Sequence, residues 1–136
     1  MVNNTNALLQ KRAFYFTFNA NSRMNTEEIR NYALQKPAVT EGFPFGEGTL
    51  VFKVNDKIFL LMGLDEPDLR FNAKCDPGKA IEWRELNPDQ ILPGYHMNKK
   101  HWNTVRVEGL KWSFIKELID HSYELVAKMK KKIKST

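Results

Sequence analysis

The residues best suited to chemistry lie close together in one polar segment, residues 93–105. Its side chains that donate hydrogen bonds, carry positive charge or offer flat faces are Tyr95, His96, Asn98, Lys99, Lys100, His101, Trp102 and Asn103. Groups of this kind bind the phosphates and bases of nucleic acid, or another anionic ligand. No complete catalytic constellation accompanies them, so the sequence predicts a binding function.

The three histidines are weak candidates for a metal site. His96 and His101 lie five residues apart on extended or turning chain, and His121 lies on the final predicted helix. Zinc requires convergent ligands, usually with a carboxylate or thiolate at a known spacing, and no helical HxxxH or HExxH pair exists here. We therefore expect surface or hydrogen-bonded histidines and predict no metal or other cofactor.

Enzyme motifs are also missing from the sequence. Cys75 falls on the apolar face of an alternating strand, which favours a buried thiol over a reactive one. Ser113 and His121 lack an acid partner and a nucleophile elbow, and the glycines match no phosphate-binding fingerprint. The sequence predicts that the protein is not an enzyme. An enzyme acting on a small anionic metabolite would need a concave pocket around His96 and Lys99.

Positive charge is concentrated at the end of the chain. The net charge is +5, with +3 in residues 1–23, −4 in residues 24–93 and +6 in residues 94–136. This polarity favours an anionic partner, although a basic half also occurs in proteins that bind none. Both interpretations stay open at this point.

Length and composition indicate one domain with a hydrophobic core. The chain has 136 residues, of which 42% are hydrophobic and 27% charged. A single cysteine cannot form an internal disulfide, which suits the cytoplasm. No apolar run approaches the ~20 residues that span a bilayer, and no secretory signal is evident. We expect a cytoplasmic protein, not bound to membrane, that is a monomer.

The core domain is predicted to occupy residues 24–136. Asn25 and Glu28 fit a capping box that opens a helix ending at Lys36-Pro37. Residues 1–23 are interpreted as an N-terminal extension, either from an upstream start or not native to the protein, that need not belong to the core fold. The aromatic run at residues 13–18 could still add a strand.

Strand patterns fill the middle of the chain. Residues 50–54 and 57–62 flank Asn55-Asp56, which predicts a tight hairpin whose second strand is central in its sheet. Residues 69–75 alternate between apolar and polar, which indicates a strand with one wet face. Asp76-Pro77 then caps a helix through about residue 85.

The last elements are a strand and a long helix. Alternation places Val105 and Val107 on one face of the strand and Trp102 and Arg106 on the other. A helix over about residues 113–131 places these residues along one side: Ile115, Leu118, Ile119, Ser122, Val126 and Met129. Its end is a cationic tail. The order of elements predicts an α+β fold, an antiparallel sheet with helices packed on one face.

Five stretches carry a family resemblance: residues 43–46, 49–54, 74–77 and 93–105, and Ser122-Tyr123. Together they resemble the MmcQ/YjbR family over about residues 24–128. The resemblance implies a frataxin-like or secretion-chaperone-like two-layer sandwich and a DNA-binding role through a pair of β-hairpin wings. The sequence departs from the family at residues 1–23 and in the basic end after Lys128.

The leading hypothesis is a nucleic-acid-binding protein that contacts phosphate, with DNA as a non-specific ligand. Lys99, Lys100 and Arg106 would neutralise phosphates, and His96, Asn98 and His101 would make polar contacts. Trp102 would stack on a base if its side chain is exposed, or brace the segment if its side chain is buried. The final helix could cover the face on which Trp102 lies. The alternative is a protein-interaction or chaperone-like module without nucleic-acid binding, which would accept a protein partner at the sheet face.

Overall fold

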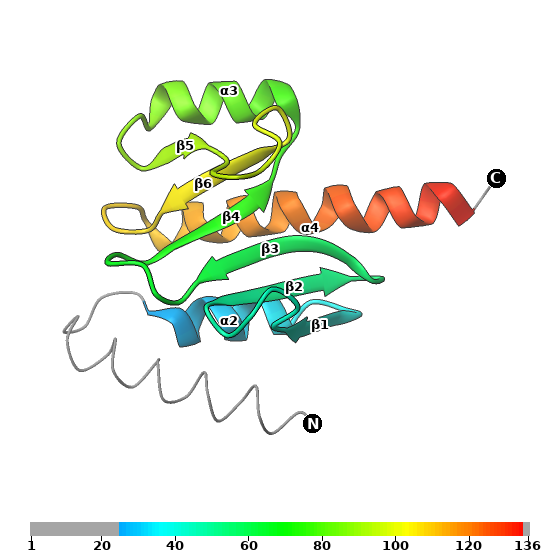
Figure 1. Cartoon of the computed structure of the whole chain (residues 1–136). Coiled ribbons are helices and arrows are strands. Elements are labelled where there is room, and N and C mark those ends of the chain that lie inside the picture. Colours follow the sequence, from blue (N-terminus) through cyan, green and yellow to red (C-terminus); the bar gives the residue numbers. More distant parts are fainter. Residues whose placement is uncertain (1–24, 135–136) are drawn as a thin grey trace.

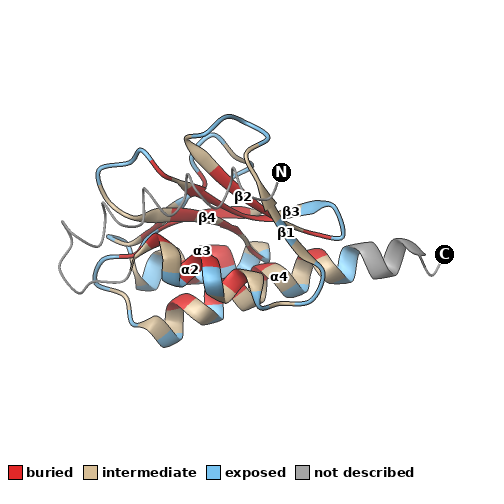
Figure 2. Ribbon diagram, turned by 90° about the horizontal axis from the view of Figure 1, so that it is seen from below, coloured by how far each residue is buried: buried red, intermediate tan, exposed pale blue. Residues whose placement is uncertain are grey.

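A computed structural model describes residues 25–134 of the protein as a single antiparallel sheet of six strands with three helices against one face (Figures 1 and 2). The elements are α2 (Thr26–Leu34), β1 (Val39–Gly42), β2 (Thr49–Val54), β3 (Lys57–Gly63), β4 (Arg70–Lys74), α3 (Pro77–Leu86), β5 (Ile91–Pro93), β6 (Trp102–Arg106) and α4 (Trp112–Lys134). The strand order is β1-β2-β3-β4-β6-β5. This confirms the predicted α+β class. The extension at residues 1–23 and its possible strand lie outside the described residues.

Local capping signals set the starts of α2 and α3, as predicted. The Asn25 side chain accepts from the Glu28 N–H, and the Glu28 carboxylate accepts from the Asn25 N–H, both at 3.0 Å. At α3, a carboxylate oxygen of Asp76 accepts from the N–H groups of Gly78 and Lys79 at 3.1 and 3.2 Å. Each cap satisfies helix N–H groups that have no partner within the helix.

The hairpin of β2 and β3 forms where the sequence predicted it. Asn55 and Asp56 both adopt left-handed backbone, with φ of 52° and 68°, as a two-residue turn that matches strand twist requires. Strand β3 lies inside the sheet between β2 and β4, which confirms its predicted central position. Two edge strands, β1 and β5, were not predicted because three or four residues are too few to show alternation.

The two faces of the sheet differ in what covers them. One face carries Phe52, Leu60, Phe71 and Val105, which pack against the helices as the main hydrophobic core. Residues that alternate with them point to the opposite face, and Figure 2 shows the labelled helices on one side of the sheet only. Among residues 25–134, no helix covers this second face, which we call the uncovered face.

Helix α4 packs across the core face with the side that the sequence predicted. Ile115, Leu118, Ile119, Ser122 and Val126 are buried on it. Met129, which was predicted to continue this side, is instead 41% exposed. Figure 1 shows the reason, because the end of α4 extends beyond the strands.

Ser122 joins α4 to two strands in the core. Its hydroxyl accepts from the Lys74 N–H at 2.9 Å and donates to the Phe59 carbonyl at 2.5 Å. Ser122 is fully buried, so no water can replace either bond. The serine therefore completes the backbone hydrogen bonding between β3 and β4.

Ser122→Ala should lower the free energy of unfolding by about 2–3 kcal/mol, because it leaves a buried N–H and a buried carbonyl without partners. Urea denaturation followed by circular dichroism measures the change. Ser113→Ala is the matched control, since Ser113 lies on the same helix but is exposed, and it should change stability by less than about 0.5 kcal/mol. Equal effects of the two substitutions would contradict this account.

Candidate functional site

The polar segment forms a loop of residues 94–101 that leads from β5 into β6 and is closed by hydrogen bonds within itself. The N–H of Gly94 donates to the Trp102 carbonyl at 2.9 Å. The Gly94 carbonyl in turn accepts from the Met97 N–H at 3.3 Å and from Lys99 Nζ at 3.2 Å. The Asn98 side chain accepts from the Lys100 N–H at 2.9 Å. We call this segment the 94–101 loop.

The tip of the loop is fixed to β4 and α3. The His101 carbonyl accepts from the Cys75 N–H at 2.7 Å, and the Lys99 carbonyl accepts from Arg84 Nη1 at 3.2 Å. The backbone contacts place His101, which is half-buried, against the start of α3. Asn98 and His101 thus help to shape the loop, a role that the sequence did not predict for them.

Four cations belong to the tip or to residues that contact the loop and the Trp102 beside it. Lys99 and Lys100 are exposed on the loop, Arg84 reaches it from α3, and Lys74 Nζ lies 5.7 Å from the centre of the Trp102 ring. Within the part of the chain that the structure describes, none of the four has a carboxylate oxygen within 4 Å. We call Lys74, Arg84, Lys99 and Lys100 the basic patch. Sequence reasoning missed Lys74 and Arg84.

Arg106, by contrast, is not brought together with Lys99 and Lys100. It lies four residues along β6 from Trp102, about 13 Å of extended strand. Its Nε donates to Asp68 Oδ2 at 2.9 Å, and Arg70 binds the other oxygen of the same carboxylate at 2.7 Å. Partial burial alone would raise the pKa of Asp68, but hydrogen bonds from the two arginines lower it. Lys99, Lys100 and Arg106, which were all predicted to neutralise phosphates, therefore do not form one cluster.

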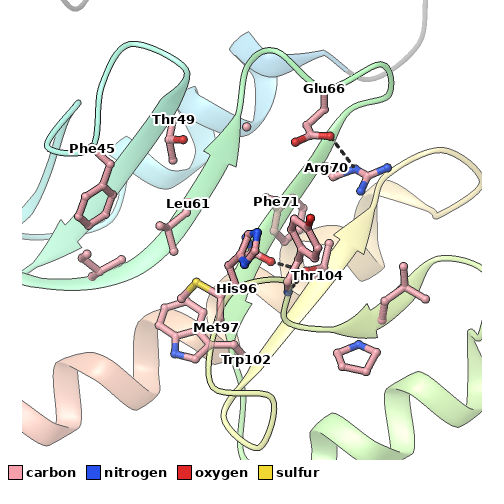
Figure 3. Close-up of a pocket in the computed structure, with 16 residues that line it drawn as sticks. Phe45, Thr49, Leu61, Glu66, Arg70, Phe71, His96, Met97, Trp102 and Thr104 are labelled. Atoms are coloured by element: carbon pink, nitrogen blue, oxygen red, sulfur yellow. Dashed lines mark hydrogen bonds and ion pairs between the residues drawn. The ribbon is translucent and has the colours of Figure 1, made fainter.

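Trp102 is buried on the uncovered face. As predicted, it points away from Val105 and Val107, and it is only 9% exposed. It forms a small second core with Val51 and Leu61, against which Met97 of the loop packs (Figure 3). The loop covers Trp102, so the expectation that the final helix could do so is wrong. Trp102 braces the loop instead of standing free to stack.

A hollow of about 800 Å³ opens on the uncovered face beside Trp102. Figure 3 shows it between the segment that carries Phe45 and the 94–101 loop, with Leu61 and Trp102 among its lining residues. At its border, Phe45 and Tyr95 are 65% and 67% exposed. The rings of Tyr95 and His96 lie 4.0 Å apart, and His96 has left-handed backbone with φ of 57°. Exposed aromatic rings therefore border this concave surface, and Lys74 of the basic patch lies over the ring of Trp102, one of its lining residues.

The remaining candidate residues have structural roles. Burial, followed by the nearby Asp76 carboxylate, raises the pKa of the Cys75 thiol to about 12, so Cys75 stays protonated and unreactive. His121 Nε2 accepts from the Asp76 N–H at 3.1 Å, and its ring meets Trp83 edge to face. No group of three His, Cys, Asp or Glu among the described residues could hold a metal ion. No described helix is long and apolar enough to cross a membrane.

Comparison with known protein families shows which family this chain belongs to. The YjbR family model matches residues 34–125, which include every strand and most of α4. The chain belongs to the YjbR family. YbdF of Escherichia coli O157:H7 is 39% identical over 101 residues, covering 74% of this chain and 82% of YbdF. YjbR of Escherichia coli K12 is 30% identical over 102 residues, covering 74% of this chain and 86% of YjbR.

Solved structures support the same relationship. A Deinococcus radiodurans protein with a DUF419 domain is 38% identical and superimposes with a TM-score of 0.72 over 75% of this chain and 78% of that one. A Pseudomonas syringae protein is 27% identical, with a TM-score of 0.63 over 76% of this chain and 99% of that one. The fold of this YjbR-family chain is thus shared with experimentally determined structures.

Gly94→Ala should disrupt the loop. A Cβ built at Gly94 would lie 2.8 Å from Trp102 Cβ and 3.0 Å from the Trp102 carbonyl oxygen, so the loop would have to move off β6. We expect a loss of about 1–3 kcal/mol in the free energy of unfolding, measured by urea denaturation. Gly42→Ala is the control, because a Cβ there meets nothing within 4 Å. An unchanged stability for Gly94→Ala would show that the loop does not hold this close contact.

His121 should make stability depend on pH. Burial lowers the pKa of His121 below the value of about 6.5 in an unfolded chain, so the unfolded state binds more protons between the two values. Stability contributed by the neutral ring is complete above about pH 6.5 and is lost as the pH falls toward the folded pKa. Wild type should therefore lose more unfolding free energy than His121→Gln between about pH 7.5 and 5.5.

Glutamine keeps a hydrogen-bond acceptor for Asp76 but does not titrate. The other two histidines are present in both proteins, so their contributions cancel in the comparison. Urea denaturation at the two pH values measures the difference. Equal losses in wild type and His121→Gln would contradict the assignment.

Proposed function

We propose that the protein binds nucleic acid through the uncovered face of its sheet, with the basic patch contacting phosphates. The observation that carries this proposal is that Lys74, Arg84, Lys99 and Lys100 lie on or in contact with the loop and Trp102, and none is ion-paired with a described carboxylate. Unpaired cations release counterions from a phosphate backbone when they bind it, and this supplies most non-specific affinity.

The surroundings of the patch fit a polyanionic chain. The β1–β2 connection, residues 42–49, and the 94–101 loop both contribute lining residues to the hollow, and we take them as the two wings of the interface. Tyr95 offers a ring for base stacking, and His96 beside it offers polar contacts at the edge of the hollow. Asp68 and Glu66 pair with Arg70 and Arg106 at the other end of the face, so the charges of these two arginines are balanced there.

The proposed role is binding without catalysis, by a cytoplasmic monomer. Glu66 and Arg70, two titratable residues lining the hollow, lie 3.9 Å apart as an ion pair. The free Cys75 is buried and held protonated, which suits a structural thiol in a reducing compartment. These features support a surface that recognises its ligand and leaves it chemically unchanged.

A protein partner is the second candidate, and it is favoured by one observation. Phe45 is exposed beside a hollow whose floor, Leu61 and Trp102, is apolar. Such a surface can bury an apolar side chain of a partner segment. Binding of that kind would depend on Phe45 and would vary little with salt.

A salt titration tests the proposed function. Anisotropy of fluorescein-labelled DNA and RNA, read from about 50 to 200 mM salt, should give log affinity falling against log salt with a slope of about −3 to −4 for four phosphate contacts. Lys99→Ala with Lys100→Ala should make the slope shallower by about 1.5 to 2.

The control is Lys57→Ala with Lys111→Ala, two exposed lysines away from the patch that carry the same change in net charge. It should leave the slope within about 0.5 of wild type. Absence of nucleic-acid binding, or equal slopes for the two double variants, would overturn the proposal. Salt-independent capture of a protein that is lost in Phe45→Ala would favour the second candidate.

A further inference from the structure

A hydrogen-bond chain on the uncovered face leaves one amide donor without a partner among residues 25–134. The Tyr95 N–H donates to Thr104 Oγ at 3.0 Å, and the Thr104 hydroxyl donates to the side-chain oxygen of Asn72. Thr104 is buried, and its hydroxyl proton is directed to the Asn72 oxygen, so the amide oxygen faces Thr104 and the NH₂ group is the other end of this amide. No acceptor among the described residues takes the NH₂ group of Asn72.

Asn72 and Thr104 both line the hollow, among apolar surfaces. The neighbouring lining includes Leu61, Met97 and Trp102 (Figure 3). A donor in such surroundings gives direction and specificity to a ligand that brings an acceptor. The hollow therefore suits a flat, largely apolar group with acceptor atoms at its edge.

A nucleobase is such a group, and the hollow is more than large enough to admit one. About 800 Å³ lies within the range of pockets that hold small ligands. In a duplex, base edges are paired and base faces are stacked, so a base enters a pocket only from a single strand or after being flipped out. Tyr95 and His96 belong to the same loop as Lys99 and Lys100, so a base site and phosphate contacts lie on one continuous segment.

We propose that the hollow receives an unpaired base of a single strand whose phosphates lie on the basic patch. The Asn72 NH₂ group donates to a carbonyl or ring nitrogen of this base, and Tyr95 stacks on a neighbouring base. This inference rests on the proposed function and adds to it a preference for single-stranded over duplex nucleic acid.

The test compares a fluorescein-labelled single strand of about 12 nucleotides with the same strand annealed to its complement. Anisotropy at one salt concentration should show the single strand binding at least about tenfold more tightly, since each stacked base contributes about 1–3 kcal/mol. Asn72→Asp keeps the acceptor for Thr104 but replaces the donor with a charged acceptor. It should weaken single-strand binding by at least about tenfold.

Asn55→Asp is the matched control, because it makes the same charge change in the exposed β2–β3 turn. It should weaken single-strand binding less than about threefold. Tyr95→Ala, at a 67% exposed position, is a second variant that should fold normally and lose at least about fivefold in single-strand affinity with little change for duplex. Thermal melting followed by circular dichroism checks the fold of each variant.

The outcomes separate the two proposals. Equal affinity for single strand and duplex, both dependent on Lys99 and Lys100, would overturn the inference and leave the proposed function standing. Equal effects of Asn72→Asp and Asn55→Asp, together with an unaffected Tyr95→Ala, would also overturn it. No binding of either form would overturn both proposals.

Discussion

The packing of Trp102 beneath the 94–101 loop is the contact on which the whole site depends. A sheet with helices on one face leaves apolar side chains of its other face without a cover. Here Trp102, Val51 and Leu61 form a second core, and Met97 of the loop closes over it. Because Gly94 approaches Trp102 too closely for any side chain, the loop lies directly on β6. The backbone that carries Lys99 and Lys100 is thereby fixed relative to the sheet.

Ion pairing differs between the two ends of the uncovered face. At one end, Asp68 accepts hydrogen bonds from Arg70 and Arg106, so two guanidinium groups share one carboxylate. At the other end, Lys74 and Lys100 have no carboxylate within 4 Å among residues that the structure describes. Exposed ion pairs contribute little to stability, so the pairing matters mainly for where positive potential remains. A net charge summed along the sequence cannot reveal this distribution.

The sequence predicted those parts of the fold that depend on near neighbours. The capping box at Asn25, the Asn55-Asp56 turn and the alternation around Trp102 are local signals, and each appears as expected. The edge strands β1 and β5 are too short to show an alternation of apolar and polar residues. Their pairing depends on contacts with strands β2 and β6, which the local sequence does not specify. Arg84 reached the site from α3 through contacts that no spacing encodes. The sequence did not predict that Arg106 lies apart from the loop, because strand alternation specifies a face of the sheet and not a position along it.

Hydrogen bonds preorganise the 94–101 loop, which favours the binding role proposed for it. Lys99 Nζ donates one hydrogen bond to the Gly94 carbonyl, which holds a flexible side chain in place and leaves two donors for a ligand. Arg84 binds the Lys99 carbonyl, so the backbone beneath that lysine is fixed from a second element. Fixing rotamers before binding reduces the conformational entropy that the ligand must overcome. In the proposed function, the hydrogen bonds that shape the loop therefore act on affinity as well as on stability, although none of them contacts the ligand.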